Sequence, residues 1–231
     1  MQISRRTLLG VGGVVVVAGG AAVWQFSRPT ASGGDSAASA RGGAIAATAS
    51  GDPRLAERSI GRADAPVVVR EFFSLTCSHC ATFHRETMPR VKRDLVDTGK
   101  VRMVFHDFPL DQIALAGAAA ARALPPASYE PFITALLASQ DRWAFARGVN
   151  NIEEIAKIAA LAGLSRSAFD AAVADEALRA EILKGRDEYA RTYGIESTPS
   201  FVFNGPGATN RREAGARPYD EFARLVQQAA G

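Results

Sequence analysis

Hydrophobic residues follow two different spacings in the first part of the folded chain. β-Branched and aromatic residues dominate Val67–Phe73, which is typical of a buried strand. Phe83, Val91 and Leu95 then recur at roughly helical spacing, and Val101–Phe105 again has the pattern of a buried strand. A strand, a helix and a second strand in this order predict a βαβ unit.

The middle of the chain shows helical spacing only. Between about residues 111 and 193 no segment has a convincing strand pattern, and Asn151 and Gly163 are suited to begin and end one of the helices. Trp143 and Phe145 are expected in the core of this helical block, with the lining of a substrate groove as the alternative. The predicted helices cover about residues 111–124, 128–140, 151–163, a stretch from 165, and 175–193.

The strand pattern returns near the C-terminus. Phe201–Phe203 precedes Asn204-Gly205, a dipeptide favoured in hairpin turns. Tyr219–Ala230 is an amphipathic helix with Pro218 at or near its first position. The order βαβ, helical block, ββα therefore predicts one interrupted α/β domain over residues 55–231, with a helical insertion at about 111–193.

The first 54 residues differ in composition from the rest. Arg5 and Arg6 precede an uncharged apolar stretch from Leu8 to Trp24, which is the pattern of an export signal peptide or a membrane anchor over residues 1–27. The paired arginines fit the twin-arginine route, and the general secretory (Sec) route is equally open. Residues 28–54 are rich in Ser, Gly and Ala, which predicts a flexible linker. We therefore expect a periplasmic protein, tethered to the inner membrane if the apolar segment is retained.

The net charge of +3 comes from residues 1–50. Residues 1–50 hold four arginines, no lysine, and Asp35 as their single acidic residue, so basic and acidic residues balance in the rest of the chain. A balanced domain lacks the excess of basic charge that is typical of nucleic-acid-binding proteins.

The chain has two cysteines, Cys77 and Cys80, at the junction between the first strand and its helix. Backbone N–H groups at the start of a helix favour the Cys77 thiolate, and a protonated His79 would favour it further. A stabilised thiolate is a good leaving group, so a Cys77–Cys80 disulfide built this way is expected to be easily reduced and to oxidise other thiols.

Two simpler interpretations of the cysteine pair remain open. A disulfide that closes a loop of about four residues would stabilise the fold by only roughly 2 kcal/mol, which is little for a structural crosslink. Cys77, Cys80 and His84 fall on one helical face and could form part of a zinc site, although no further ligand follows at the usual spacing. Otherwise His84 and His106 are interpreted mainly as structural or surface residues.

Several motifs together resemble one known family. Glu71–Cys80 reads EFFSLTCSHC, a helical insertion follows it, and Ser197-Thr198-Pro199 stands before the last strands. This combination resembles the DsbA-type thiol–disulfide oxidoreductases, over roughly Leu55 to the C-terminus. The resemblance implies an α/β protein with a thioredoxin-like fold that is interrupted by an all-helical insertion.

The resemblance implies catalytic roles for four residues. Cys77 would be the exposed nucleophile and Cys80 the more buried resolving thiol. His79 would stabilise the Cys77 thiolate, with a merely solvated side chain as the alternative. Glu71 would be a buried acid that relays a proton to or from Cys80; a carboxylate facing water is the alternative, because strand alternation alone does not identify the inner face.

The resemblance also implies a substrate-binding role for Thr198 and Pro199. Pro199 would be a cis-proline that packs against the disulfide and holds Thr198 for pairing with an extended substrate strand; an ordinary trans turn is the alternative. Two positions depart from the best-known DsbA pattern, since Ser78 stands in place of proline and Thr198 in place of valine. With these departures, both an oxidase and an isomerase or reductase are open as the direction of exchange.

The expected activity is the introduction of disulfide bonds into exported proteins through the Cys77–Cys80 pair. The resemblance implies reduced exported proteins as substrates and a membrane redox partner of the DsbB type, with no organic cofactor, no metal and no nucleic acid. A disulfide isomerase or reductase is the closest alternative. A copper- or metal-binding protein that uses the cysteine pair, and a non-catalytic holdase, follow it.

Overall fold

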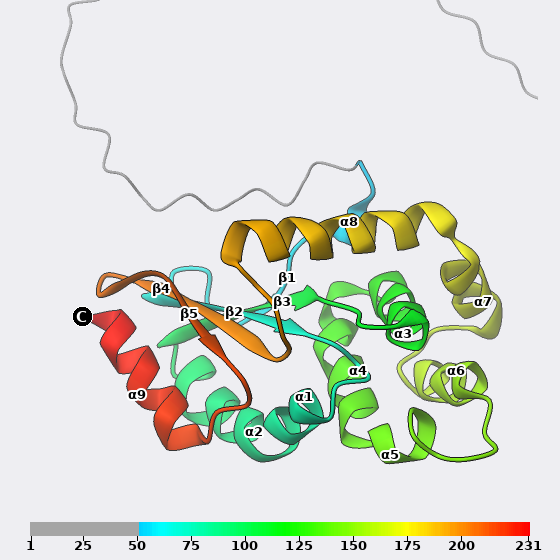
Figure 1. Cartoon of the computed structure of the whole chain (residues 1–231), viewed down its shortest axis with the longest axis horizontal. Helices are drawn as coiled ribbons and strands as arrows, with labels where there is room; N and C mark the ends of the chain where they lie inside the picture. The colour runs from blue at the N-terminus through cyan, green and yellow to red at the C-terminus, as the bar shows by residue number, and fades with distance from the viewer. Residues whose placement is uncertain (1–50) are drawn as a thin grey trace, which may run out of the picture. The chain divides into compact units, whose positions relative to one another are not determined.

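The computed structural model describes residues 51–231 (Figure 1). The predicted leader, residues 1–27, and the predicted linker up to residue 50 lie outside the described residues. In the part of the chain that is described, no helix has the length and apolar character needed to cross a membrane.

Five strands form one mixed sheet in the order β1-β3-β2-β4-β5. β2 and β3 are parallel, which confirms the predicted βαβ unit, and the other neighbouring strands pair antiparallel. β1 was not expected from the sequence, because three residues are too few to show a hydrophobic period. The strands are β1 (Arg58–Ile60), β2 (Val67–Phe73), β3 (Val101–Asp107), β4 (Ser200–Gly205) and β5 (Ala208–Ala214).

Helices cover both faces of this sheet (Figure 1). α8 (Glu176–Tyr193) runs along one face, and α9 (Tyr219–Ala230) lies on the other together with the helix that begins at the cysteines. The central strand β2 is therefore covered on both sides, and most of its residues are buried. Glu71, a polar residue of β2, is consequently buried inside the protein.

The helix after β2 is one run that contains two π-helical turns. Its parts are α1 (Ser78–Thr82), the π-helical turn η2 (Phe83–Thr87), α2 (Met88–Val91) and the π-helical turn η3 (Lys92–Val96). Pro89, which has no N–H to donate, lies at the start of α2 directly after η2. Isolated π-helical turns are frequent at functional sites, and η2 carries His84.

The segment between β3 and β4 is helical, as its spacing predicts. Its helices are α3 (Gln112–Ala123), α4 (Pro126–Ala138), α5 (Gln140–Trp143), α6 (Asn151–Leu161), α7 (Arg166–Ala174) and α8. Trp143 is buried and donates its indole N–H to the Leu136 carbonyl at 2.7 Å, which confirms its predicted place in the core.

Two expectations for this block were wrong. Phe145 is 57% exposed, because it follows the end of the short helix α5 and points outward from the loop. The residue that caps α6 is Asn150, whose side chain accepts from the backbone N–H groups of Ile152 and Glu153. Asn151 is instead the first helical residue, and its side-chain amide donates to the Trp143 carbonyl.

The expected hairpin between β4 and β5 is present, but its turn lies two residues later than predicted. Asn204 and Gly205 belong to β4, where the register shifts between Phe203 and Gly205, so Pro206 and Gly207 make the turn. The Asn204 side chain accepts from the backbone N–H of Asn210 across the hairpin at 2.9 Å.

The hairpin packs against the C-terminal end of α9 with little space between the two backbones. The Gly207 N–H donates to the Ala229 carbonyl at 2.9 Å, and a Cβ atom at Gly205 would collide with that same carbonyl. Glycine at position 205 is therefore required by the close approach of the helix.

Replacing Gly205 by Ala is expected to lower the free energy of unfolding by about 1–3 kcal/mol, because the added methyl group forces the hairpin and α9 apart. Denaturant unfolding of the variant measures this loss. Gly185→Ala in α8 is the matched control, since its Cβ would make only an ordinary contact with Tyr189. The control is expected to be neutral or stabilising, and equal stability of the two variants would contradict the packing argument.

Candidate active site

Cys77 lies at the entry to α1, where the chain turns from β2 into the helix. Its N–H donates to the Ser74 carbonyl at 3.1 Å, and it is the N-cap residue of α1. Both cysteines are free thiols in this structure; Cys77 is 9% exposed and Cys80 is fully buried. The thiol that reaches the surface is therefore Cys77, and Cys80 lies beneath it.

A side chain from the helical block fixes this turn. Gln140, at the start of α5, is buried and donates its side-chain amide to the carbonyls of Leu75 and Cys77, at 2.7 and 3.1 Å. The insertion therefore contacts the backbone of the cysteine motif directly. Sequence reasoning missed Gln140, because nothing in its local pattern indicates a contact with residues more than 60 positions earlier in the chain.

The surroundings of Cys77 favour its thiolate. The pKa of Cys77 is lowered to about 5, first by a hydrogen bond with the Cys80 side chain, then by the Thr198 side chain and by the backbone N–H groups of Cys80 and His79. Partial burial acts in the opposite direction and is outweighed. Cys77 is consequently ionised near neutral pH.

The surroundings of Cys80 favour its protonated thiol. Full burial is the main cause that raises its pKa well above the usual value, and the hydrogen bond and the negative charge of Cys77 raise it further. The charge of Glu71 acts in the same direction. The pKa values of the two cysteines are thus shifted in opposite directions. Cys77 is a thiolate, and the Cys80 thiol donates a hydrogen bond to it.

Glu71 lies on β2 with its side chain completely buried rather than facing water. In the sheet it stands between Phe105 of β3 and Phe201 of β4. One carboxyl oxygen, Oε1, is 2.9 Å from His84 Nε2, whereas Oε2 has no hydrogen-bond partner. A buried carboxyl oxygen without a partner is costly and calls for a functional explanation.

His84 is the ring that faces Glu71, and the sequence did not identify this pairing. It lies on η2, is buried, and has its Nδ1 atom 3.4 Å from the Thr134 hydroxyl of α4. The ring nitrogens of His84 are thus directed to Glu71 and Thr134, not to a metal site shared with Cys77 and Cys80. Among residues 51–231 no cluster of three or more metal-binding side chains occurs.

The loop before β4 places Thr198 beside Cys77. The Thr198–Pro199 peptide bond is cis, so the alternative of an ordinary trans turn is excluded. The Cys77 thiol donates to the Thr198 carbonyl at 3.2 Å, and in this protonated state the Thr198 hydroxyl is buried without a partner. When Cys77 ionises its sulfur can only accept, and the Thr198 hydroxyl becomes a donor available to it.

His79 has an exposed side chain, one residue before Cys80 on α1. The group of His79 that lowers the Cys77 pKa is its backbone N–H. The expected contribution of the imidazole to the thiolate stays a prediction.

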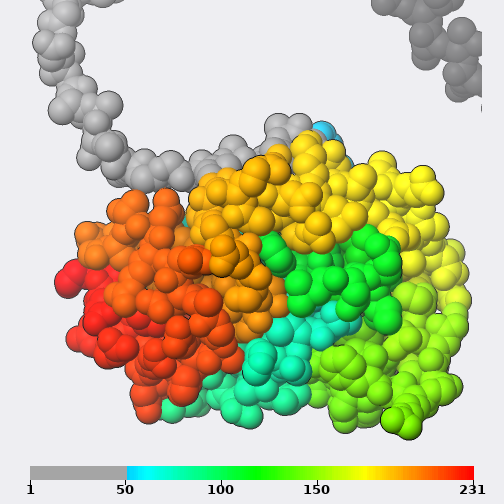
Figure 2. Space-filling view, in the orientation of Figure 1, coloured from blue at the N-terminus to red at the C-terminus, as the bar shows by residue number. Residues whose placement is uncertain are grey.

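The cysteine helix reaches the surface between two other parts of the chain. Figure 2 shows the cyan part of the chain between the orange segment that leads into the last strands and the green helical block. The turn after β2, the start of α5 and the loop before β4 therefore meet around Cys77.

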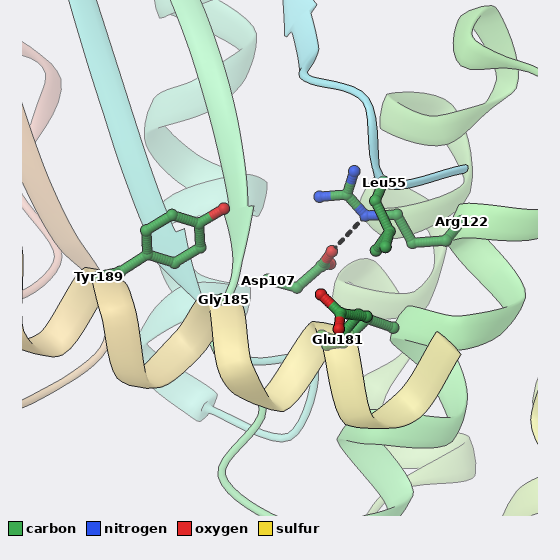
Figure 3. Close-up of a pocket in the computed structure, with 7 residues that line it drawn as sticks. Leu55, Asp107, Arg122, Glu181, Gly185 and Tyr189 are labelled. Carbon is green, nitrogen blue, oxygen red and sulfur yellow. Dashed lines mark hydrogen bonds and ion pairs between the residues drawn. The ribbon is translucent and has the colours of Figure 1, made fainter. Parts of the chain in front are cut away.

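A second buried polar group lies elsewhere, around the Asp107–Arg122 ion pair (Figure 3). Arg122 Nε donates to Asp107 at 2.6 Å, and the Tyr129 hydroxyl donates to the same carboxylate at 2.7 Å. The adjoining cavity has a volume of about 30 Å³, enough for a water molecule and far below the size of a substrate pocket. Its lining consists of Leu55, Asp107, Arg122, Glu181, Ile182, Gly185 and Tyr189.

Comparison with known proteins fits this geometry. The family model described as Thioredoxin matches residues 54–228. The chain belongs to the thioredoxin family. Family membership and the helical insertion between β3 and β4 together confirm the predicted thioredoxin-like fold with an all-helical insertion.

Among solved structures, the chain is similar to proteins named DsbA and protein-disulfide isomerase. The crystal structure of alpha-DsbA1 from Wolbachia pipientis matches with a TM-score of 0.69 and 27% identity, over 75% of this chain and 90% of that protein. The structure named protein-disulfide isomerase from Novosphingobium aromaticivorans matches with a TM-score of 0.63 and 24% identity, over 74% of this chain and 95% of that one, which supports the fold alone. The predicted resemblance to DsbA-type proteins is thus confirmed.

A relative from Rickettsia prowazekii carries the name "Putative protein-disulfide oxidoreductase". It is 28% identical to this chain over 152 residues. The match covers 65% of this chain and 55% of that relative. The chain thus spans about half the length of the curated relatives it matches.

The Cys77 thiolate should be measurable as a pH-dependent reactivity. Alkylation of the reduced protein is expected to rise with pH through a midpoint of about 5 and to level off above it, because Cys77 loses its proton there. Cys80→Ala is expected to shift this midpoint upward by removing the main hydrogen-bond donor. Cys80→Ser keeps a donor and serves as the control. A midpoint of about 8.5, as in free cysteine, would contradict the assigned surroundings.

Proposed function

We propose that this protein is a thiol–disulfide oxidoreductase that passes the Cys77–Cys80 disulfide to reduced exported proteins. The observation that carries the proposal is the opposed pair of thiols, with the pKa of Cys77 lowered to about 5 and that of Cys80 raised. A stabilised thiolate favours the reduced form of the pair, so the oxidised form tends to take electrons from other thiols. The resemblance to alpha-DsbA1 supports this direction.

The reaction consists of two exchanges at sulfur. A substrate thiolate attacks the Cys77 sulfur, the Cys77–Cys80 bond breaks, and Cys80 leaves and takes up a proton. A second thiolate of the substrate then attacks the substrate sulfur of the mixed disulfide, and Cys77 leaves as a thiolate. The substrate has lost two electrons and gained a disulfide, and the protein pair has gained those two electrons.

Thr198 and Pro199 are proposed to hold the substrate during these steps. The Thr198 carbonyl lies 3.2 Å from the Cys77 sulfur, so a peptide whose cysteine reaches Cys77 must pass along this loop. An extended peptide can pair there with backbone groups, as in other cases of strand addition.

Reoxidation and location complete the proposal. Each turnover leaves Cys77 and Cys80 reduced, and a membrane protein of the DsbB type is proposed to restore their disulfide. Residues 1–27 are proposed to direct export to the periplasm, by the twin-arginine or the Sec route, and to tether the protein to the inner membrane if they are retained.

A disulfide isomerase or reductase is the second candidate, and one observation favours it. The Thr198 hydroxyl is buried next to the Cys77 sulfur and can donate to a departing thiolate, which eases the breaking of a mixed disulfide. A copper-binding role has weaker support, because the nearest histidine at helical spacing, His84, is bonded to Glu71 instead.

The equilibrium of the Cys77–Cys80 pair with glutathione tests the direction of exchange. We expect a reduction potential less negative than about −200 mV, within or above the range of an oxidising compartment. Mass spectrometry of protein equilibrated in glutathione buffers gives the value. A potential near about −270 mV, which is typical of thioredoxin, would place the protein among the reductases.

His79→Ala isolates the contribution of the imidazole, because the variant keeps the backbone N–H that acts on Cys77. We expect a higher Cys77 pKa and a less oxidising pair, since a protonated imidazole near the sulfur favours the thiolate. Ser78→Ala is the control, because Ser78 is the exposed residue next to His79. It is expected to alter neither the Cys77 pKa nor the reduction potential of the pair. If His79→Ala behaves like this control, the role of His79 is limited to its backbone.

A further inference from the structure

A row of hydrogen-bonded side chains extends from Glu71 toward the protein surface at Lys92. Glu71 Oε1 lies 2.9 Å from His84 Nε2, and His84 Nδ1 lies 3.4 Å from the Thr134 hydroxyl. Thr134 in turn lies 3.1 Å from Glu130 Oε1, one turn earlier on α4. These four side chains come from β2, η2 and α4, so they form a tertiary arrangement rather than a local one.

The outer end of this row reaches solvent. Glu130 is 7% exposed, and Lys92 donates to both of its carboxylate oxygens at 2.9 and 3.0 Å. The Lys92 side chain is 41% exposed. A proton that arrives at Glu130 can therefore leave the protein there.

The hydrogen-bond directions are consistent along the whole row. An ionised Glu130 can only accept, so the Thr134 hydroxyl donates to it and itself accepts from His84 Nδ1–H. His84 Nε2 is then free to accept a proton from Glu71 or, once protonated, to donate to it. Each group can thus take a proton on one side and release one on the other.

The inner end of the row lies near the buried thiol. Among the groups that act on Cys80 is the charge of Glu71, and Glu71 Oε2 is the carboxyl oxygen that lacks a partner. The rings of Phe73 and Phe83 flank His84, with ring centroids 6.2 and 5.8 Å away. His84 therefore lies between apolar rings, with its two ring nitrogens directed to Glu71 and Thr134.

Titratable groups from several elements surround Cys80 and the row of side chains. They are Cys77 and Cys80 on the cysteine helix, Glu71 on β2, His84 on η2, Glu130 on α4 and Lys92 on η3.

We propose that Glu71, His84, Thr134 and Glu130 form a proton relay that supplies and removes the proton of Cys80 during disulfide exchange. The proposal rests on the thiol–disulfide exchange proposed above and adds His84 and Thr134 to it as positioning residues, since neither touches the reacting sulfurs. A purely structural His84–Glu71 pair would need neither the link to Thr134 nor the open Oε2 oxygen.

The relay supplies the proton that Cys80 needs in the first exchange step. The substrate thiolate forms a bond to the Cys77 sulfur, the Cys77–Cys80 bond breaks, and its electron pair remains on Cys80. Cys80 takes a proton from Glu71, which regains one through His84. A proton from solvent then replaces it by way of Glu130 and Thr134. In the reverse direction Cys80 gives its proton to Glu71, and the same groups carry it outward.

The test follows both steps in one reaction of the reduced full chain with oxidised glutathione. The Cys77 thiolate first attacks glutathione disulfide and releases one glutathione. Cys80 then loses its proton and attacks the Cys77 sulfur, which releases the second. Acid quenching and mass spectrometry resolve the mixed disulfide in time. The first step uses the Cys77 thiolate that is already formed and needs no proton transfer from Cys80, so it is an internal control for the second.

Thr134→Val removes the hydroxyl and keeps the shape of the side chain. We expect the second step at pH 7 to slow by about 100-fold, the low end of what positioned proton transfer contributes, with the first step unchanged. Thr134→Ser restores a hydroxyl and is expected to restore the rate. Thr87→Val is the matched control, because Thr87 is a buried threonine of η2 that donates to the Arg217 carbonyl outside the row.

His84→Gln is a second variant, which tests the relay even if the Thr134→Val protein does not fold. The amide keeps a donor toward Glu71 but cannot pass a proton on, so the second step is again expected to slow while the first is unchanged. If the second step proceeds at the wild-type rate in a folded Thr134→Val or His84→Gln protein, the relay is refuted. If the wild-type protein does not carry out the first step, the proposed exchange activity itself fails, and the relay fails with it.

Discussion

The hydrogen bond between the Cys80 thiol and the Cys77 sulfur is the interaction on which the chemistry of this protein depends. It is the largest cause of the lowered Cys77 pKa, and it acts against the partial burial that would otherwise keep that thiol protonated. The same contact raises the pKa of Cys80. The two sulfurs therefore cannot be understood separately, because one holds its charge only while the other keeps its proton.

The fold maintains this contact with segments that are far apart in the sequence. β2 and the turn after it place Cys77, the loop before β4 brings the Thr198 carbonyl to 3.2 Å from its sulfur, and Gln140 of the helical block holds the turn from the other side. The sheet register sets the depth of Glu71 between two phenylalanines. The helical insertion thus takes part in the construction of the site, as well as extending the surface around it.

The sequence carried the information for most of the architecture and for part of the site. Val67–Phe73 and Val101–Phe105 were identifiable because their runs of β-branched and aromatic residues are long, whereas β1 is too short to show a period. The Asn204-Gly205 dipeptide indicated a hairpin but misplaced its turn, because both residues belong to β4 and Gly205 serves the close approach of α9 instead.

Within the site, the spacing of Cys77 and Cys80 could be identified from the sequence. The opposite shifts of their pKa values could not, because these depend on burial and on the contact between the two sulfurs, which the local sequence does not show. The pairing of Glu71 with His84 joins a strand to a π-helical turn, and the link to Thr134 joins that turn to the insertion. Such contacts follow from how whole elements pack. Motif spacing therefore identified the reacting atoms but not the groups that control their protons.

The bridge made by Gln140 has a consequence for how the molecule can change. One amide group ties the two carbonyls of the cysteine turn to the start of α5, so the insertion bears directly on the backbone of the redox motif. A change in the insertion that moves Gln140 would therefore also release the backbone that carries Cys77. The packing of the insertion and the placement of the reactive sulfur are coupled through this one side chain.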